Sequence, residues 1–304
     1  MYRNTDAGAI TDNLTISDGN GRSGLTNVLK GVLVNGYSDA SKPAAGWLNT
    51  FSDPGNNIEV LENGYGLNFK IDEESVYAAR VEGFESMTSA TEGVKGRWTD
   101  ETFIWHVGRN GNTRPHDWVV IADENFFLMA VRQRLGQSDT DDLAFFGIAE
   151  IDAGLRNDTV AIFGNNTLTT QNNFTGRNAL HADSDSTYMS IYNDNVTTRA
   201  VNGGLVHGST VFGSSEGTGI QPFNDGIFYR EPLIRTPELR IAGKIKNIFE
   251  PIGVWGGGNI NVAGANTEEF FFYDGQDDLL GKKVCFAHGT LHTTEWSVLM
   301  VADE

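Results

Sequence analysis

Residues 118–131 read Trp-Val-Val-Ile-Ala-Asp-Glu-Asn-Phe-Phe-Leu-Met-Ala-Val, which is two apolar runs joined by a short polar step. The runs at 118–121 and 126–131 have the length and composition of buried strands. Asn125 stands at the bend between them, and asparagine is a residue that tight turns favour. The stretch therefore predicts a β-hairpin whose second strand is buried.

Similar short apolar runs, separated by turn residues, recur on both sides of this hairpin. The expected strands are residues 58–61, 66–71, 76–81, 103–107, 144–151, 160–163, 187–192, 205–212, 227–229, 239–241, 245–249, 270–273, 283–287 and 296–301. Turn formation is favoured by the 36 glycines, and only 7 prolines interrupt the chain. We therefore predict a mainly β protein, in which antiparallel sheets form a sandwich or a barrel.

One segment near the N-terminus has helical rather than strand periodicity. Its apolar residues form one stripe: Leu25, Val28, Leu29, Val32 and Leu33. This spacing predicts a single amphipathic helix over about residues 23–35. Ser23 is suited to cap its start, and Gly36 is suited to end it.

Composition changes along the chain suggest four regions. Residues 1–22 are polar and rich in Gly and Asp, which predicts an extended N-terminal arm. Residues 23–163 are expected to form a β domain with the helix. Residues 164–225 are rich in Asn, Thr and Gly, and are interpreted as an inserted lobe. Residues 226–304 carry further strands, which either complete the core or form a second β domain.

The charge of the chain argues against nucleic-acid binding. Forty acidic residues outnumber 22 basic ones, for a net charge of −18. Because nucleic-acid binders neutralise phosphates with clustered Lys and Arg, we expect no sequence-specific nucleic-acid partner. No apolar run approaches the roughly 20 residues of a membrane helix, and no apolar signal region is visible at the start, so neither membrane insertion nor standard export is expected.

Three short phrases in the first 47 residues occur in an order that resembles a family of tailed-phage virion structural proteins. They are Tyr-Arg-Asn-Thr-Asp-Ala-Gly-Ala at 2–9, Leu-Val-Asn-Gly-Tyr at 33–37 and Lys-Pro-Ala-Ala-Gly-Trp at 42–47. Looser matches follow at 78–87, 118–123, 145–147, 240–244 and 250–252. The last two lack the Leu-Pro-Gly core of the family pattern, and residues 164–225 lie outside the resemblance.

The resemblance implies a structural part of a virion, in the tail, neck or baseplate, made in the cytoplasm of a bacterial host. It implies a symmetric homo-oligomer that also contacts other virion proteins. It implies no catalytic residues, so the chain is expected not to be an enzyme and to need no cofactor. We single out five residues as interface candidates: Tyr2, Arg3, Asp6, Trp98 and Trp255. In particular, residues 1–20 are expected to contact another chain.

Three further groups of residues contain the side-chain types of a metal or catalytic site. His288, His292 and Glu295 lie close in sequence, but the pattern lacks the Glu that follows the first His in the zinc-binding helix motif. Acidic groups at Asp139, Asp141 and Asp142, and at Glu268 and Glu269, are the candidates for paired glycosidase carboxylates. Oxygen ligands for calcium are available at Asp183, Asp185, Asn193 and Asp194. Solvated turns explain these groups better.

The single cysteine and most of the tryptophans are expected to be core residues. Cys285, the single cysteine, lies in a Val-Cys-Phe-Ala run and is expected to be a small buried residue. Most of the six tryptophans neighbour apolar strand residues, which favours core packing.

The sequence leaves two alternatives to a purely structural role. The 164–225 region is a candidate for binding a host-surface glycan, which would make the chain a receptor-binding virion protein. A glycan-degrading enzyme is the least favoured interpretation, because no constellation of residues supports it.

Overall fold

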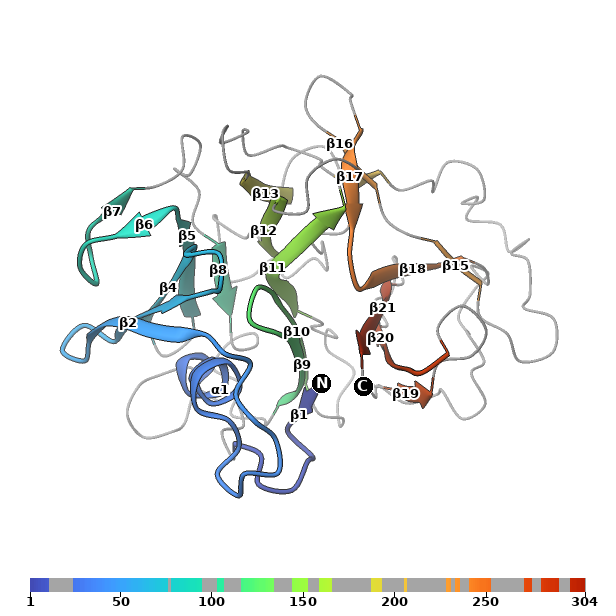
Figure 1. Ribbon diagram of the computed structural model, residues 1–304, viewed down its shortest axis with the longest axis horizontal. Helices are drawn as coiled ribbons and strands as arrows, with labels where there is room; N and C mark the ends of the chain where they lie inside the picture. Colours follow the sequence, from blue (N-terminus) through green and yellow to red (C-terminus); the bar gives the residue numbers. More distant parts are fainter. Residues whose placement is uncertain are drawn as a thin grey trace.

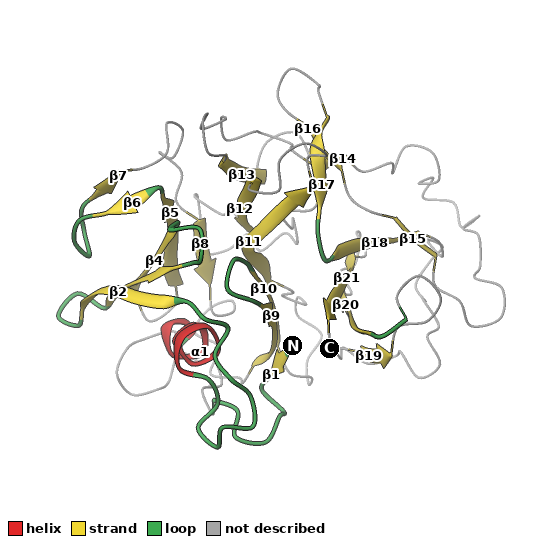
Figure 2. Ribbon diagram, viewed as in Figure 1, coloured by secondary structure: helices red, strands yellow, loops and turns green. Residues whose placement is uncertain are grey.

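The computed structural model describes residues 1–10, 24–75, 78–94, 103–106, 116–133, 144–152, 159–165, 187–192, 205–206, 228–230, 233–235, 241–252, 271–274, 280–289 and 296–303. In these residues the protein is mainly β, with several antiparallel sheets and one helix (Figures 1 and 2). The sheets described here stay open, and none closes into a barrel. Of the two predicted architectures, the barrel is therefore not found.

The first sheet has five strands in the order β2-β3-β4-β5-β8. The strands are β2 (Leu48–Asp53), β3 (Ile58–Glu62), β4 (Asn68–Ser75), β5 (Ala78–Phe84) and β8 (Phe103–His106). All neighbours are antiparallel, and consecutive strands pair through short turns. Beside this sheet, β6 (Ser86–Met87) and β7 (Gly93–Val94) form a two-stranded ribbon.

The second sheet has nine strands and includes the hairpin that residues 118–131 predicted. Its main path is β1-β9-β10-β11-β17-β16-β14, and β12 and β13 branch from β11. The strands are β1 (Tyr2–Arg3), β9 (His116–Ala122), β10 (Phe127–Gln133), β11 (Ala144–Asp152), β12 (Thr159–Asn165), β13 (Thr187–Tyr192), β14 (Leu205–Val206), β16 (Leu233–Arg235) and β17 (Ile241–Ile245). The hairpin is confirmed, because β9 pairs antiparallel with β10 from Ala122↔Phe127 to His116↔Gln133.

The third sheet has five strands in the order β15-β18-β21-β20-β19. They are β15 (Phe228–Arg230), β18 (Ile248–Ile252), β19 (Phe271–Asp274), β20 (Lys282–Gly289) and β21 (Trp296–Asp303). Cys285 of β20 is fully buried, as expected. Figure 1 places the two termini next to each other in this view, where β1 and the third sheet approach.

The predicted helix is present as α1 (Leu25–Lys30), continued without a break by the π-helical turn η1 (Gly31–Asn35). All five residues of the predicted apolar stripe have no exposed surface. Gly36 ends the helix at a φ of 76°. Ser23 lies outside the described residues; instead of a side-chain cap, the Thr26 amide donates to the buried Glu73 carboxylate at 3.0 Å.

An apolar core lies between the helix, the first sheet and the β9–β10 hairpin. Phe127 of the hairpin is at its centre, with edge-on ring contacts to Trp47 at 5.5 Å and to Phe69 of β4 at 5.1 Å between centroids. Trp47 and Trp118 are both buried there, which confirms their expected core role. Burial of such large aromatic side chains contributes strongly to the stability of the core.

Some strand predictions were wrong or incomplete. Residues 245–249 do not form one strand, because Ile245 ends β17, Lys246 and Asn247 make a turn, and Ile248 begins β18. Asn247 adopts a φ of 65°, which asparagine tolerates better than most residues. The short strands β2 and β16 were not predicted, because their sequences lack the apolar content of the other strands or are very short.

The described part of the chain includes no helix with the length and apolar character needed to cross a bilayer.

Candidate functional site

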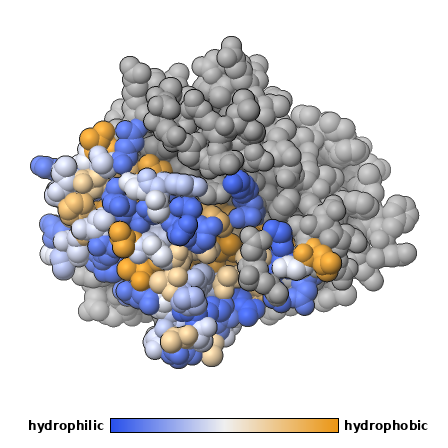
Figure 3. Space-filling model, viewed as in Figure 1, coloured by the Kyte–Doolittle hydropathy of each residue, from blue (hydrophilic) through white to orange (hydrophobic). Residues whose placement is uncertain are grey.

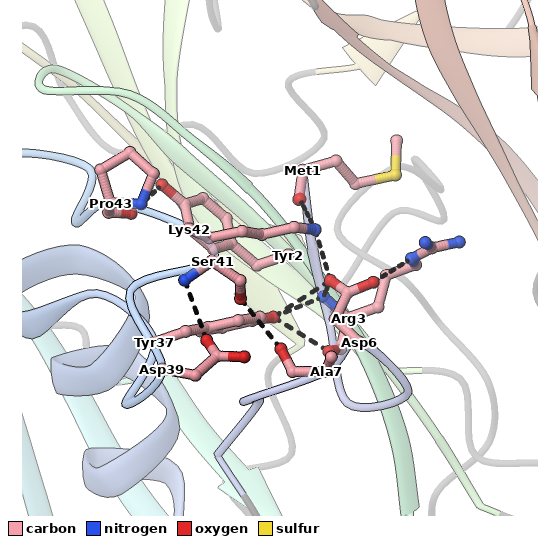
Figure 4. Close-up of polar contacts among 10 residues, drawn as sticks. All are labelled: Met1, Tyr2, Arg3, Asp6, Ala7, Tyr37, Asp39, Ser41, Lys42 and Pro43. Atoms are coloured by element: carbon pink, nitrogen blue, oxygen red, sulfur yellow. Dashed lines mark hydrogen bonds and ion pairs between the residues drawn. The ribbon is translucent and has the colours of Figure 1, made fainter.

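The first ten residues dock on the body of the protein, where they meet the turn that follows the helix (Figure 4). We call residues 1–10 together with residues 36–47 the N-terminal clasp. On one side, β1 pairs with β9 through Tyr2↔Val120 and Arg3↔Val119. The Asn4 amide extends this pairing by donating to the Trp118 carbonyl at 3.3 Å. The clasp thus covers the edge of the nine-stranded sheet.

Tyr2 is the apolar anchor of the clasp. Its ring is 6% exposed and meets the edge of the Tyr37 ring at a centroid distance of 5.7 Å. Its hydroxyl donates to the Pro43 carbonyl at 3.0 Å, so the buried phenol keeps a hydrogen bond. Burial raises the pKa of Tyr2, which keeps the hydroxyl a neutral donor.

Tyr37 holds the backbone of Arg3 from the side opposite β9. The Arg3 amide donates to the Tyr37 hydroxyl at 2.8 Å, and that hydroxyl donates to the Arg3 carbonyl at 2.9 Å. Burial, together with the nearby Asp6 charge, raises the pKa of Tyr37 far above its usual value. This side chain therefore replaces a neighbouring strand and satisfies the outer backbone groups of β1.

Asp6 is the charge centre of the clasp, and its carboxylate is only 8% exposed. Asp6 Oδ1 accepts from Arg3 Nε at 2.9 Å, and Oδ2 accepts from the Arg3 amide at 2.9 Å. Lys42 Nζ also donates to Asp6 Oδ2, and to the Met1 carbonyl at 2.6 Å. Burial opposes ionisation of Asp6, but the hydrogen bonds and charges of Lys42 and Arg3 outweigh it and lower the pKa of Asp6.

Gly8 lets the segment pass close to the turn at residues 37–42. Its φ is +69°, and a Cβ at this position would lie 2.0 Å from Asp39 Cγ. The Gly8 carbonyl accepts from the Ser38 amide at 3.3 Å, and the Ala7 carbonyl accepts from the Ser41 hydroxyl at 3.0 Å. Asp39 caps the same turn by accepting the Ser41 amide at 2.9 Å, and hydrogen bonding to Ser41 lowers the pKa of Asp39.

The end of the helix positions the other half of the clasp. The carbonyl of Leu33 accepts the amides of Gly46 and Trp47 at 3.1 and 3.0 Å, and the Val32 carbonyl accepts that of Ala45 at 3.0 Å. These bonds satisfy carbonyls that a helix terminus leaves without helical partners. Gly36 permits the reversal, since a Cβ there would lie 2.9 Å from the Lys42 carbonyl oxygen and the Ala44 nitrogen.

Two further contacts tie the clasp to strands far away in sequence. Asn4 Nδ2 donates to Asp117 Oδ1 at 2.6 Å, at the start of β9. The Arg3 guanidinium lies over the ring of Phe272 in β19, with Cζ 4.6 Å from the ring centroid. The clasp therefore contacts the helix end, the second sheet and the third sheet.

A second junction links the tips of two hairpins. The β3–β4 turn meets the β9–β10 turn through Asn63 Nδ2, which donates to the Asn125 carbonyl at 2.8 Å, and the Gly64 amide, which donates to the Glu124 carbonyl at 2.7 Å. The Trp47 indole adds a third bond, to the Asp123 carbonyl at 2.8 Å. This junction fixes the first sheet relative to the second.

The predicted interface candidates divide into two groups. Tyr2, Arg3 and Asp6 come together in the clasp, whereas Trp98 and Trp255 lie outside the described residues. Sequence reasoning missed Tyr37 and Lys42 as their binding partners. The available signal was the pair of quoted phrases at 33–37 and 42–47, which contain these two residues.

Most of the alternative chemistry also lies outside the described residues. This applies to Asp139, Asp141, Asp142, Asp183, Asp185, Asn193, Asp194, Glu268, Glu269, His292 and Glu295. The backbone of His288 is described, in β20 opposite Ser297. Among the residues that the structure describes, no three His, Cys, Asp or Glu side chains gather to hold a metal ion.

The described surface carries no large apolar area in the view of Figure 3, where polar residues separate small apolar patches. Large exposed apolar side chains stand apart from one another, for example Leu48 in β2 at 60% exposure and Leu280 before β20 at 79%. Burial raises the pKa of the Cys285 thiol well above its usual value, so this cysteine is an inert core residue. The clasp is an extensive polar arrangement among the described residues.

Comparison with protein-family models, curated proteins and solved structures finds no match to this chain. In the residues that the structure describes, the fold defines the class as mainly β, with several antiparallel sheets and one helix. The named polar groups of the clasp are engaged with one another, with nearby backbone or with the Asp117 side chain.

Proposed function

We propose that this chain is a structural component of a tailed-phage virion, which assembles by self-association and by contact with other tail, neck or baseplate proteins. The observation that carries the proposal is the clasp itself. The phrases at 2–9, 33–37 and 42–47, on which the resemblance rests, meet there in one set of contacts. Because these three segments contact one another in the folded protein, they form one structural unit. This gives a physical reason why the three segments occur together in one sequence.

The chemistry of the clasp supports a structural role. Arg3 and Lys42 both pair with Asp6 at hydrogen-bonding distance, which serves to position a chain segment. The net charge of −18 keeps a protein soluble at high copy number. We propose accordingly that the chain is not an enzyme, needs no cofactor, and resides in the virion after synthesis in the bacterial cytoplasm.

We also propose that the finer architecture is a β-sandwich. Apolar side chains of β3, β4 and β5 in the first sheet, and of β9 and β10 in the second, belong to one buried cluster. The helix lies at one end of the same cluster. Two sheets that contribute opposite faces to one core are the defining feature of a sandwich.

The test is to locate the chain in particles and to measure its assembly state. Multi-angle light scattering on the purified full chain is expected to give a mass that is a multiple of one 33.2 kDa chain. Mass spectrometry of purified particles is expected to detect it in a fixed copy number, and a particle reconstruction would show its layer. A purified chain that stays monomeric and is absent from particles would overturn the proposal. A chain whose deletion leaves particles intact but blocks adsorption would indicate receptor binding instead.

A further inference from the structure

In the clasp, β1 covers one side of β9, where the backbone amides and carbonyls of β9 can pair with a strand. β9 contributes four consecutive buried apolar residues, Trp118 to Ile121, and β1 is its outer neighbour. Without β1, the backbone groups of β9 would form an open sheet edge, which readily pairs with another chain. Residues 1–10 therefore occupy a site that accepts a strand.

The covering segment also ends the sheet. The outward-facing Arg3 amide is bound by the Tyr37 hydroxyl at 2.8 Å and by Asp6 Oδ2 at 2.9 Å, so β1 offers this donor to no further strand. A strand that pairs on one side and is blocked on the other adds once and stops. Such a strand joins two chains without offering its outer edge for further strand pairing.

The contacts that dock the segment are almost all distant in sequence. Tyr2 and Pro43 are 41 residues apart, Arg3 and Tyr37 are 34 apart, and Asn4 and Asp117 are 113 apart. The Arg3–Asp6 pair is internal to the segment and travels with it. The same segment from a second copy would therefore make the same contacts.

Chain length and binding strength both permit such an exchange. The 13 residues at 11–23 connect the segment to the helix and can span at most about 45 Å. Among the first ten residues, Tyr2 and the Asp6 carboxylate are buried, and Ala9 and Ile10 pack against the core, so docking combines limited apolar burial with directional polar contacts. When docking is of modest strength, the high local concentration of neighbours in an assembly decides which copy is bound.

We infer that, in the assembled protein, residues 1–10 of each copy dock on β9 and on the turn at residues 37–43 of a second copy. This inference rests on the proposed self-association, and the partner is another copy of the same chain. Each protomer gives one strand and receives one. The exchange holds neighbours together through a site that the fold has already formed, so no new complementary surface is needed.

Engineered disulfides across the β1–β9 pair test the exchange in the full chain. Arg3 and Val119 are direct neighbours in the register, so R3C and V119C are placed in a C285A background, which removes the native thiol. Two differently tagged chains, one with R3C and the other with V119C, are co-expressed and oxidised. We expect a disulfide-linked product that contains both tags, because only a segment docked on another copy brings the two thiols together.

The matched control is S52C with E59C, in the β2–β3 hairpin, whose side chains lie 3.0 Å apart. Placed in one chain, this pair is expected to close within the chain, and split between two tagged chains it is expected to give no product. If R3C or V119C prevents folding, N4C and D117C with a short bis-maleimide reagent probe the same contact.

The outcomes separate the two proposals. An assembled protein that gives no product with both tags, while R3C and V119C placed together in one chain close within that chain, overturns the exchange and leaves the virion proposal standing. A monomer that is absent from particles overturns both. A product with both tags, in a chain that is absent from particles, supports the exchange and overturns the virion role.

Discussion

The apolar core and the N-terminal clasp are neighbours in space but are held together by different forces. In the core, Phe127 makes edge-on ring contacts with Trp47 and with Phe69. In the clasp, Asp6, Lys42, Arg3 and the two tyrosines are joined by hydrogen bonds and ion pairs. Apolar burial is strong and non-directional, whereas a hydrogen bond contributes little net stability but fixes geometry. The core should therefore determine whether the chain folds, and the clasp where its first ten residues lie.

The largest effect is expected in the core, from Phe127→Ala. Removing this fully buried ring loses its transfer free energy and leaves a cavity, at a cost of about 3–5 kcal/mol in the free energy of unfolding. Urea denaturation measures the change. Leu280→Ala, at a residue that is 79% exposed, is the control and should change stability by less than about 0.5 kcal/mol. Similar small effects at both sites would contradict the assignment of Phe127 to the core.

A smaller and more local effect is expected from Asp6→Asn in the clasp. Lys42 and Arg3 lose their ionised partner, and hydrogen bonds to charged groups contribute about 1.5–3 kcal/mol. Hydrogen exchange of the Arg3 amide should speed up by about tenfold or more, whereas core amides should change little. A uniform loss of protection across the β9–β10 hairpin would show that the clasp and core are one cooperative unit.

The same carboxylate predicts how the clasp depends on pH. The pKa of Asp6 is lowered in the folded protein, so its contribution is fully present above the unfolded carboxyl pKa of about 3.9. That contribution is lost as the pH falls through the lower pKa of the folded state. The difference in unfolding free energy between the wild type and Asp6→Asn should therefore be constant near neutrality and shrink in acid. A difference that grows as the pH falls would contradict this sign.

Gly8→Ala tests the close approach between the two halves of the clasp. The left-handed backbone and the contact of a new Cβ with Asp39 should together cost about 2 kcal/mol of docking free energy. Gly66→Ala is the matched control, because Gly66 has a φ of +78° but open space around its Cβ position. Equal effects on the protection of residues 1–10 would mean that the contact with Asp39 does not hold the segment.

The smallest expected effect is at the contact between the clasp and the third sheet. Arg3 lies over Phe272, and both side chains are more than a third exposed, so their coupling should be about 0.5–1 kcal/mol. A double-mutant cycle with Arg3→Ala and Phe272→Ala isolates this coupling from the Arg3–Asp6 pair. A coupling of zero would separate the clasp energetically from β19.

The core could be predicted from the sequence much better than the clasp, for a physical reason. The apolar spacing from Leu25 to Leu33 and the two apolar runs around Asn125 directly indicate which residues are buried. The predicted helix and the predicted hairpin are both confirmed. The Ile245–Phe249 prediction was wrong because a turn at Lys246 and Asn247 interrupts an otherwise apolar run. Local pattern shows which residues are buried but not where a two-residue turn divides them.

The clasp depends on polar partners that no local pattern connects. Nothing around Asp6 indicates that Lys42 will bind it, or that Asn4 will reach Asp117. Such pairs are determined by the path of the chain in three dimensions, since one polar side chain can pair with many others. The quoted phrases indicated that both halves of the clasp mattered, but not that they touch. The interface roles of Trp98 and Trp255 stay predictions.

The junction of the two hairpin tips has an evolutionary and practical consequence. Surface turns usually tolerate insertions, but Asn63 and Gly64 are bonded to the backbone of Asn125 and Glu124. A change of length in either turn would break a junction with the other, so we expect their lengths to vary together among relatives of this chain. An epitope tag belongs instead at the turn around Gly55, where three consecutive residues, Pro54 to Asn56, are exposed.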